Sequence, residues 1–227
     1  MIISHKYKFI FIKNRKVAGT SIEAYFSQHC GNLDIITRGG DIKGRNARGI
    51  WNPYAEFISA GNLKKRYEVL SDFIYFNKYK SHMGARLLQT RIPKKTWESY
   101  YKICIERNPW DKTLSYYHMK KHNPSFPKMS FDQFLSSHHS LCSDFDRYCG
   151  PDGNILVDSL LRYESLLSDL SQVCEKLRIP FDGDLGFNIN SQFRTDRRSY
   201  RDVYTDSQRQ VVATVYKREI DLLGYEF

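Results

Sequence analysis

The sequence lacks several patterns that would place it in a common class of protein. Its five cysteines are scattered and form no C-x-x-C pair, which indicates reduced thiols and no metal site of the zinc type. No apolar run approaches the roughly 18 residues of a membrane span. The stretch from Met1 to Lys13 contains no signal-peptide core, so we expect a cytoplasmic protein without a membrane span.

Two further patterns are absent, and both bear on the kind of molecule that the protein binds. The Walker pattern G-x-x-x-x-G-K-[ST] does not occur, which argues against an ordinary ATP or GTP hydrolase. No Lys/Arg-rich tail stands out, which weakens the case for a nucleic-acid-binding protein. The net charge is nevertheless +10 and the sequence pI is near 9.3. A charge of this size implies an anionic partner.

The length of 227 residues fits one domain, 1–227, with a large core. Residues 30–66 contain several glycines and show no periodic spacing of apolar residues, so we expect an irregular insertion there. Long loops in compact domains are often functional; part of an acceptor pocket and a surface insertion without a role are both open. Elsewhere strands lead into helices, which predicts an α/β fold with a short central parallel sheet flanked by helices.

The stretch from Tyr7 to Gln28 has the pattern of an anion site. An apolar, β-rich run ends at Ile12, and Lys16-Val17-Ala18-Gly19-Thr20-Ser21 leads into a helical pattern. The free N–H groups and dipole of a helix N-terminus favour anions, and Gly19 would allow close approach of a ligand. The alternative is a capping box between Thr20 and Glu23, which needs no ligand.

A second strand-to-helix junction follows at Tyr100 to Tyr117. Tyr100 to Glu106 reads as a buried strand, and Asn108, Pro109 and Asp111 suit the first positions of a helix. Arg107 then stands at the carboxyl end of a strand, where open α/β sheets bind ligands. The alternative is a local ion pair between Arg107 and Asp111.

Together these segments resemble the sulfotransferases that use 3′-phosphoadenosine-5′-phosphosulfate (PAPS), in particular the bacterial and Golgi carbohydrate type. The resemblance covers nearly the whole chain and thins between residues 30 and 66. It implies a P-loop-like three-layer fold. It also implies sulfuryl transfer from PAPS to a hydroxyl or amine of a small metabolite or carbohydrate, with release of adenosine 3′,5′-bisphosphate (PAP) and no metal. One departure is Arg15, where many members have proline.

The resemblance also assigns roles to residues. The loop for the 5′-phosphosulfate corresponds to Lys16, Val17, Ala18, Gly19, Thr20 and Ser21. The 3′-phosphate motif corresponds to Arg107 and Ser115. A basic loop that closes over the cofactor corresponds to the segment with Arg194, Arg197, Arg198, Tyr200 and Arg201, although such a run also suits a solvated face.

The chemistry assigns two catalytic roles. Lys16 would neutralise charge that develops on the leaving oxygen. His82, in Lys80-Ser81-His82-Met83, would accept the proton of the acceptor, since an imidazole titrates near neutral pH. Glu23 and Glu106 are the alternative bases. Two other functions stay open: a nucleotide kinase with a degenerate phosphate loop, and a non-enzymatic basic nucleic-acid-binding module.

Overall fold

The computed structural model describes residues 1–37, 63, 66, 67, 70, 79–137, 143–186 and 198–227. These residues form a mixed α/β structure around a five-stranded sheet with the order β3-β1-β2-β4-β5. The strands are β1 (Ile2–Ser4), β2 (Phe9–Phe11), β3 (Ile35–Ile36), β4 (Tyr101–Glu106) and β5 (Ser159–Arg162). Most of the predicted insertion at 30–66 lies outside the described residues, but β3 falls within its start.

The sheet is parallel only across β2, β4 and β5. Strand β1 pairs antiparallel with both β2 and β3, so the prediction of a parallel sheet is wrong for this half. The reason is the length of a connection. Ser4 pairs with Phe9, which leaves four residues between the strands, whereas a parallel crossover needs about a dozen. Only a hairpin can form there.

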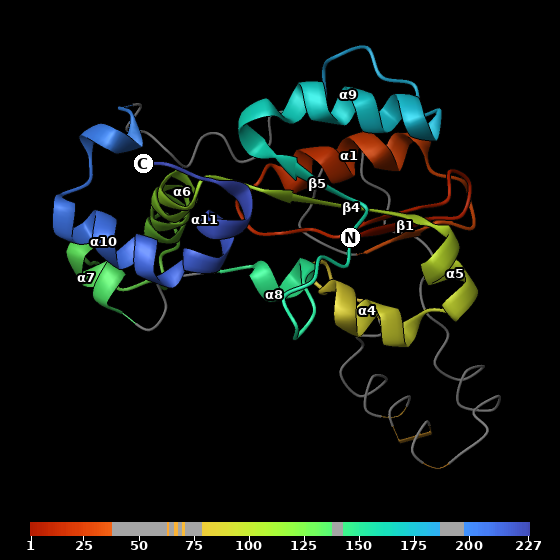
Figure 1. Ribbon diagram of the computed structural model, residues 1–227, viewed down its shortest axis with the longest axis horizontal. Coiled ribbons are helices and arrows are strands. Elements are labelled where there is room, and N and C mark those ends of the chain that lie inside the picture. The colour runs from red at the N-terminus through yellow and green to blue at the C-terminus, as the bar shows by residue number, and fades with distance from the viewer. Residues whose placement is uncertain (38–62, 64–65, 68–69, 71–78, 138–142, 187–197) are drawn as a thin grey trace.

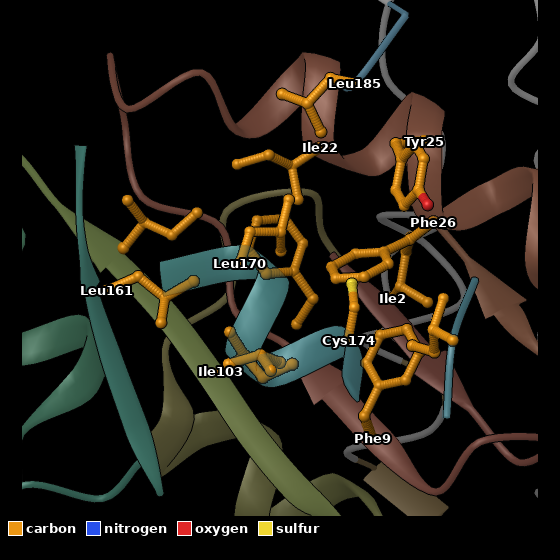
Figure 2. Packing of buried hydrophobic residues seen from close by; sticks show 14 of the residues in the cluster. Ile2, Phe9, Ile22, Tyr25, Phe26, Ile103, Leu161, Leu170, Cys174 and Leu185 are labelled. Carbon is orange, nitrogen blue, oxygen red and sulfur yellow. The ribbon is translucent and has the colours of Figure 1, made fainter. Parts of the chain in front are cut away.

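Helices cover both faces of the sheet (Figure 1). On one face lie α1 (Gly19–His29) and α9 (Leu166–Leu177); on the other lie α4 (Ala85–Arg91), α5 (Lys94–Ser99) and the short α8 (Phe145–Tyr148). Strand side chains alternate between the two cores. Figure 2 shows the first core, where Phe9 and Ile103 pack against Phe26 of α1 and Leu170 of α9. Burying each such side chain contributes about 1.5–3 kcal/mol.

A third core lies beside the sheet, among helices that follow β4 in the chain. It is built by α6 (Pro109–Lys121), α7 (Phe131–Ser136), α10 (Asp206–Val215) and α11 (Lys217–Leu223), with Trp110 and Tyr216 buried at its centre. Two 3-10 turns are also present, η1 (Tyr163–Ser165) and η3 (Tyr200–Asp202). Within the described ranges, none of the helices combines the length and apolar character needed to cross a bilayer.

The capping residues of α6 and α10 explain where these helices begin. Asn108 caps α6 by accepting hydrogen bonds from the backbone N–H groups of Trp110 and Asp111, as predicted. Thr205 caps α10 in a capping box with Gln208. Because α6 starts directly after β4, its N-terminus lies at the carboxyl edge of the parallel strands, next to the loop that follows β2.

Candidate functional site

Helix α1 begins at Gly19 without a side-chain cap. The residue before it, Ala18, has a left-handed backbone with φ 57°, and Lys16 has φ 62°. This conformation costs a non-glycine residue roughly 1–2 kcal/mol, and such strain gathers at ligand-binding sites. Thr20 lies inside the helix rather than at its N-cap, so the capping box predicted as an alternative for Thr20 and Glu23 is wrong. The dipole at the start of α1 favours an anion.

Glu23 has a different partner inside the protein. It is fully buried and accepts a hydrogen bond from Nζ of Lys13 at 2.6 Å and another from the amino group of Met1. The Lys13 side chain passes against Gly19, where an added Cβ would lie 2.8 Å from its Cγ. Gly19 is thus required by the Lys13–Glu23 pair, a reason that sequence reasoning missed when it assigned the glycine to ligand approach.

Arg107 joins the two predicted anion-binding segments. Its Nε and Nη2 donate to Oδ2 of Asp111 at 2.9 and 2.6 Å, and its Nη1 donates to the carbonyl oxygen of Lys16 at 2.9 Å. The guanidinium also stacks on Tyr163, with 3.9 Å from Cζ to the ring centroid. The ion pair with Asp111, predicted as the alternative role, is confirmed. Among the described residues these contacts use three of the five N–H groups, so two can meet a further oxygen.

Lys16 carries its charge in an unfavourable environment. Burial and the nearby charge of Arg107 lower the pKa of its ammonium from 10.5 to about 8. Both effects disfavour the charged form, and a bound anion would oppose both. The loop therefore brings two cationic groups together at the start of α1, which is the arrangement expected of an anion-binding site.

The remaining predicted cofactor-binding residues lie around the same junction where the structure describes them. Thr20 and Ser115 are both partly exposed, and neither hydroxyl makes a hydrogen bond to another residue in the described part of the chain. Ser21 and Val17 are buried. Ser115 stands four residues after Asp111, so it shares the face of α6 that binds Arg107.

The C-terminal basic segment reaches the start of α6. Burial raises the pKa of the Tyr200 phenol in η3, and the side chain of Asn108 lies close enough to oppose that rise. Arg198 and Arg201 are exposed, and Arg201 lies over the ring of Tyr200. Arg194 and Arg197 lie outside the described residues. The structure thus brings Tyr200 to the second predicted segment.

His82 lies beside the loop that follows β2. Its Nδ1 is 3.1 Å from the carbonyl oxygen of Lys13, so Nδ1 carries the proton and donates, which leaves the Nε2 lone pair available. Desolvation and the Lys13 charge lower the pKa of the imidazole to about 4, although the residue as a whole is exposed. The ring is therefore uncharged at neutral pH, but it is a weaker base than the expected imidazole that titrates near neutral pH.

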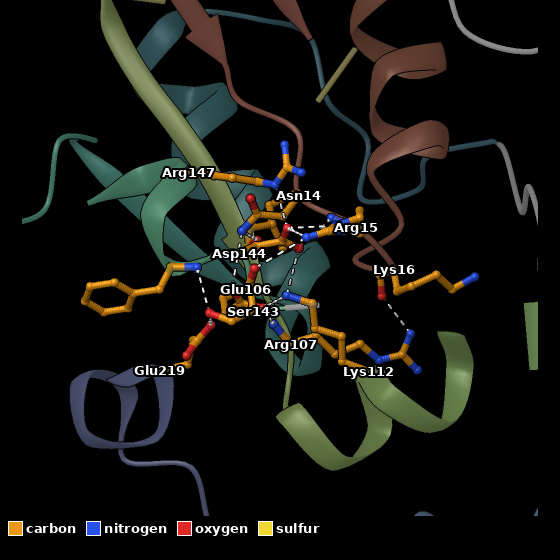
Figure 3. A network of polar contacts seen from close by, with 12 residues as sticks. Asn14, Arg15, Lys16, Glu106, Arg107, Lys112, Ser143, Asp144, Arg147 and Glu219 are labelled. Atoms are coloured by element: carbon orange, nitrogen blue, oxygen red, sulfur yellow. Dashed lines mark hydrogen bonds and ion pairs between the residues drawn. The ribbon is translucent and has the colours of Figure 1, made fainter. Parts of the chain in front are cut away.

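The two alternative bases, Glu106 and Glu23, are both buried and paired with basic groups. Glu106 is fully buried and accepts from Nζ of Lys112 at 2.6 Å, and Glu23 is paired as described above. Sequence reasoning missed the network beyond Glu106, which includes Asn14, Lys112 and Asp144 (Figure 3). One signal was available: a carboxylate at the end of a buried strand needs a buried counter-charge.

The described residues contain no group of three or more His, Cys, Asp or Glu side chains that could hold a metal ion. No family model matches the chain. A protein of Archaeoglobus fulgidus, described as an uncharacterized protein, is 33% identical over 110 residues, which cover 47% of this chain and 91% of that protein.

Proposed function

Because this chain belongs to the same family as the uncharacterized archaeal protein, whose description names no activity, we propose its function from the site itself. The proposed activity is transfer of a sulfuryl group from PAPS to a hydroxyl or amine of a small metabolite or carbohydrate. The proposed architecture is the P-loop-like three-layer fold of PAPS-dependent sulfotransferases. The sequence resemblance motivates both.

One contact carries the proposal. The hydrogen bond from Arg107 Nη1 to the Lys16 carbonyl, at 2.9 Å, joins two strand-to-helix junctions that are far apart in the sequence. PAPS has a phosphosulfate at one end and a 3′-phosphate at the other, so it needs two anion-binding sites fixed relative to one another. The α1 junction with Lys16 and Thr20 would take the phosphosulfate. The α6 junction with Arg107 and Ser115 would take the 3′-phosphate.

The chain's residues can perform the transfer steps. The acceptor oxygen or nitrogen forms a bond to sulfur while the bond from sulfur to the 5′-phosphate oxygen breaks, and the acceptor's proton passes to Nε2 of His82. The charge left on the phosphate oxygen is stabilised by the ammonium of Lys16 and by the α1 N–H groups. A proton acceptor typically contributes 10²–10⁴-fold in rate.

The test is ligand binding followed by turnover. Calorimetry should show that the protein binds PAP more tightly than adenosine 5′-phosphate, which lacks the 3′-phosphate. Arg107→Lys keeps the charge but loses the planar guanidinium, so it should weaken binding of PAP much more than binding of adenosine 5′-phosphate. Mass spectrometry of products from an acceptor library with PAPS then reports the reaction.

Three outcomes would contradict the proposal. The first is a protein that binds PAP no better than adenosine 5′-phosphate. The second is Mg²⁺-dependent turnover of ATP, the behaviour of a nucleotide kinase. The third is salt-sensitive binding of an oligonucleotide without turnover, which would indicate a nucleic-acid-binding module.

A further inference from the structure

Asp144 is a buried carboxylate that binds three basic side chains. Its side chain is 0% exposed. Arg15 donates from its backbone N to Oδ2 and from Nε to Oδ1, each at 2.9 Å. Nζ of Lys112 lies 3.0 Å from Oδ2, and Nε of Arg147 lies 2.5 Å from Oδ1. The three cations stabilise the ionised form and hold the pKa of Asp144 at about 2 although burial opposes this.

Each of these basic residues adjoins or contacts a different part of the candidate site (Figure 3). Arg15 directly precedes Lys16 in the loop before α1. Arg147 also donates through Nη1 to the carbonyl oxygen of His82. Lys112 in α6 binds Glu106, which precedes Arg107. A single carboxylate therefore connects the loop, the turn that carries the histidine and the second strand-to-helix junction.

We propose that Asp144 is a positioning residue that fixes the loop at residues 13–18 and the turn at residues 81–84 relative to each other. The inference rests on the proposed sulfuryl transfer, in which a group held by the loop must face the imidazole. The backbone N–H of Arg15 is one of the donors, and a proline there would have none. His82 is then held from two directions, by Arg147 and by the Lys13 carbonyl.

The first experiment needs no ligand. Hydrogen exchange by mass spectrometry compares the full chain with Asp144→Asn and with the control Asp146→Asn, which removes a carboxylate two residues further on, in α8. Asp146 pairs with Arg218 at 2.8 Å and its side chain is 77% exposed. Asp144→Asn should speed exchange at least tenfold in both 13–18 and 81–84, and Asp146→Asn in neither. A response confined to one segment, or equal responses to both variants, would overturn the proposal.

Two further variants remove the side-chain connections one at a time, while the backbone bond from Arg15 to Asp144 stays in place, and they decide the matter if Asp144→Asn does not fold. Arg147→Ala should loosen only 81–84, and Arg15→Ala only 13–18. Misplacement of a reacting group by about 1 Å lowers the rate by up to about 100-fold. Arg147→Ala should therefore lower kcat with PAP affinity unchanged, while Arg15→Ala should weaken PAP binding. If both variants lower the same parameter in proportion to a fall in Tm, the role is structural and the proposal is wrong.

The two proposals fail in different ways. If the wild type neither binds PAP nor transfers sulfate, the proposed function fails and the exchange data still decide whether Asp144 couples the two segments. If turnover is found and the exchange of both segments is unchanged in Asp144→Asn, the function stands and the positioning role is refuted.

Discussion

Replacement of Lys16 by methionine should stabilise the unliganded protein. The pKa of its ammonium falls from 10.5 to about 8 because burial and Arg107 disfavour the charge. At about 1.36 kcal/mol per pH unit, that change corresponds to roughly 3 kcal/mol against the charged form. Solvent reaches part of the side chain and reduces the figure, so we expect a gain of roughly 1–2 kcal/mol. For a domain of this size, that raises Tm by roughly 2–8 °C.

The pH dependence follows from the same pKa. Below a pH of about 8, Lys16 is charged in the folded protein and lowers the free energy of unfolding by the full amount. As the pH rises from about 8 towards 10.5, the folded protein loses this proton before the unfolded chain does, and the cost disappears. The advantage of Lys16→Met should therefore be present at pH 7 and nearly gone at pH 10. Urea unfolding of both proteins at the two pH values measures it.

The control and the ligand complete this test. Lys217→Met removes an exposed lysine, 72% accessible, from its pair with Asp221, and should change stability by less than about 1 kcal/mol. PAP should raise the Tm of the wild type more than that of Lys16→Met, which keeps Arg107 but loses the ammonium. If Lys16→Met is less stable than the wild type at pH 7, or if the difference in stability is the same at pH 10, the charged ammonium of Lys16 does not destabilise the folded protein.

The remaining predictions concern three other positions. His82→Ala should keep its affinity for PAP and lose about 10²–10⁴-fold in turnover, measured by product mass; near-normal turnover would end its assignment as the base. Gly19→Ala should lower Tm and weaken PAP binding, since the new Cβ would lie 2.8 Å from Lys13 Cγ; a neutral variant would show that Lys13 can move aside. Lys112→Met should cost about 3–5 kcal/mol in urea unfolding, because it leaves the buried carboxylate of Glu106 without its partner; a loss under 1 kcal/mol would mean that water reaches that carboxylate.

Local signals predicted the helices best. Asn108 and Pro109 correctly indicated the start of α6. The C-terminal helical region begins after the capping residue Thr205, ends at Gly224 and divides at Tyr216 into α10 and α11. The strand order was harder, because β1 has only three residues and shows no period, so the antiparallel hairpin went unnoticed.

The sequence named the residues of the candidate site but not the contacts that hold them in place. The sequence pointed to Lys16 and Arg107, and the structure brings them into contact. It could not show that Arg107 both pairs with Asp111 and bonds to the loop, since one contact is local and the other spans the sheet. Asp144 follows no motif, and its importance comes only from tertiary contacts.

The mixed sheet has a consequence for the order of folding. The hairpin of β1 and β2 closes a loop of a few residues, whereas pairing of Phe9 with Tyr101 joins β2 to β4 across a long stretch of chain. Longer loops cost more entropy to close, and non-local pairing is slower. A refolding chain that has made only the hairpin carries Lys16 without Arg107 beside it. Competence to bind an anion should therefore arise with the slowest phase of refolding, well after the first secondary structure has formed.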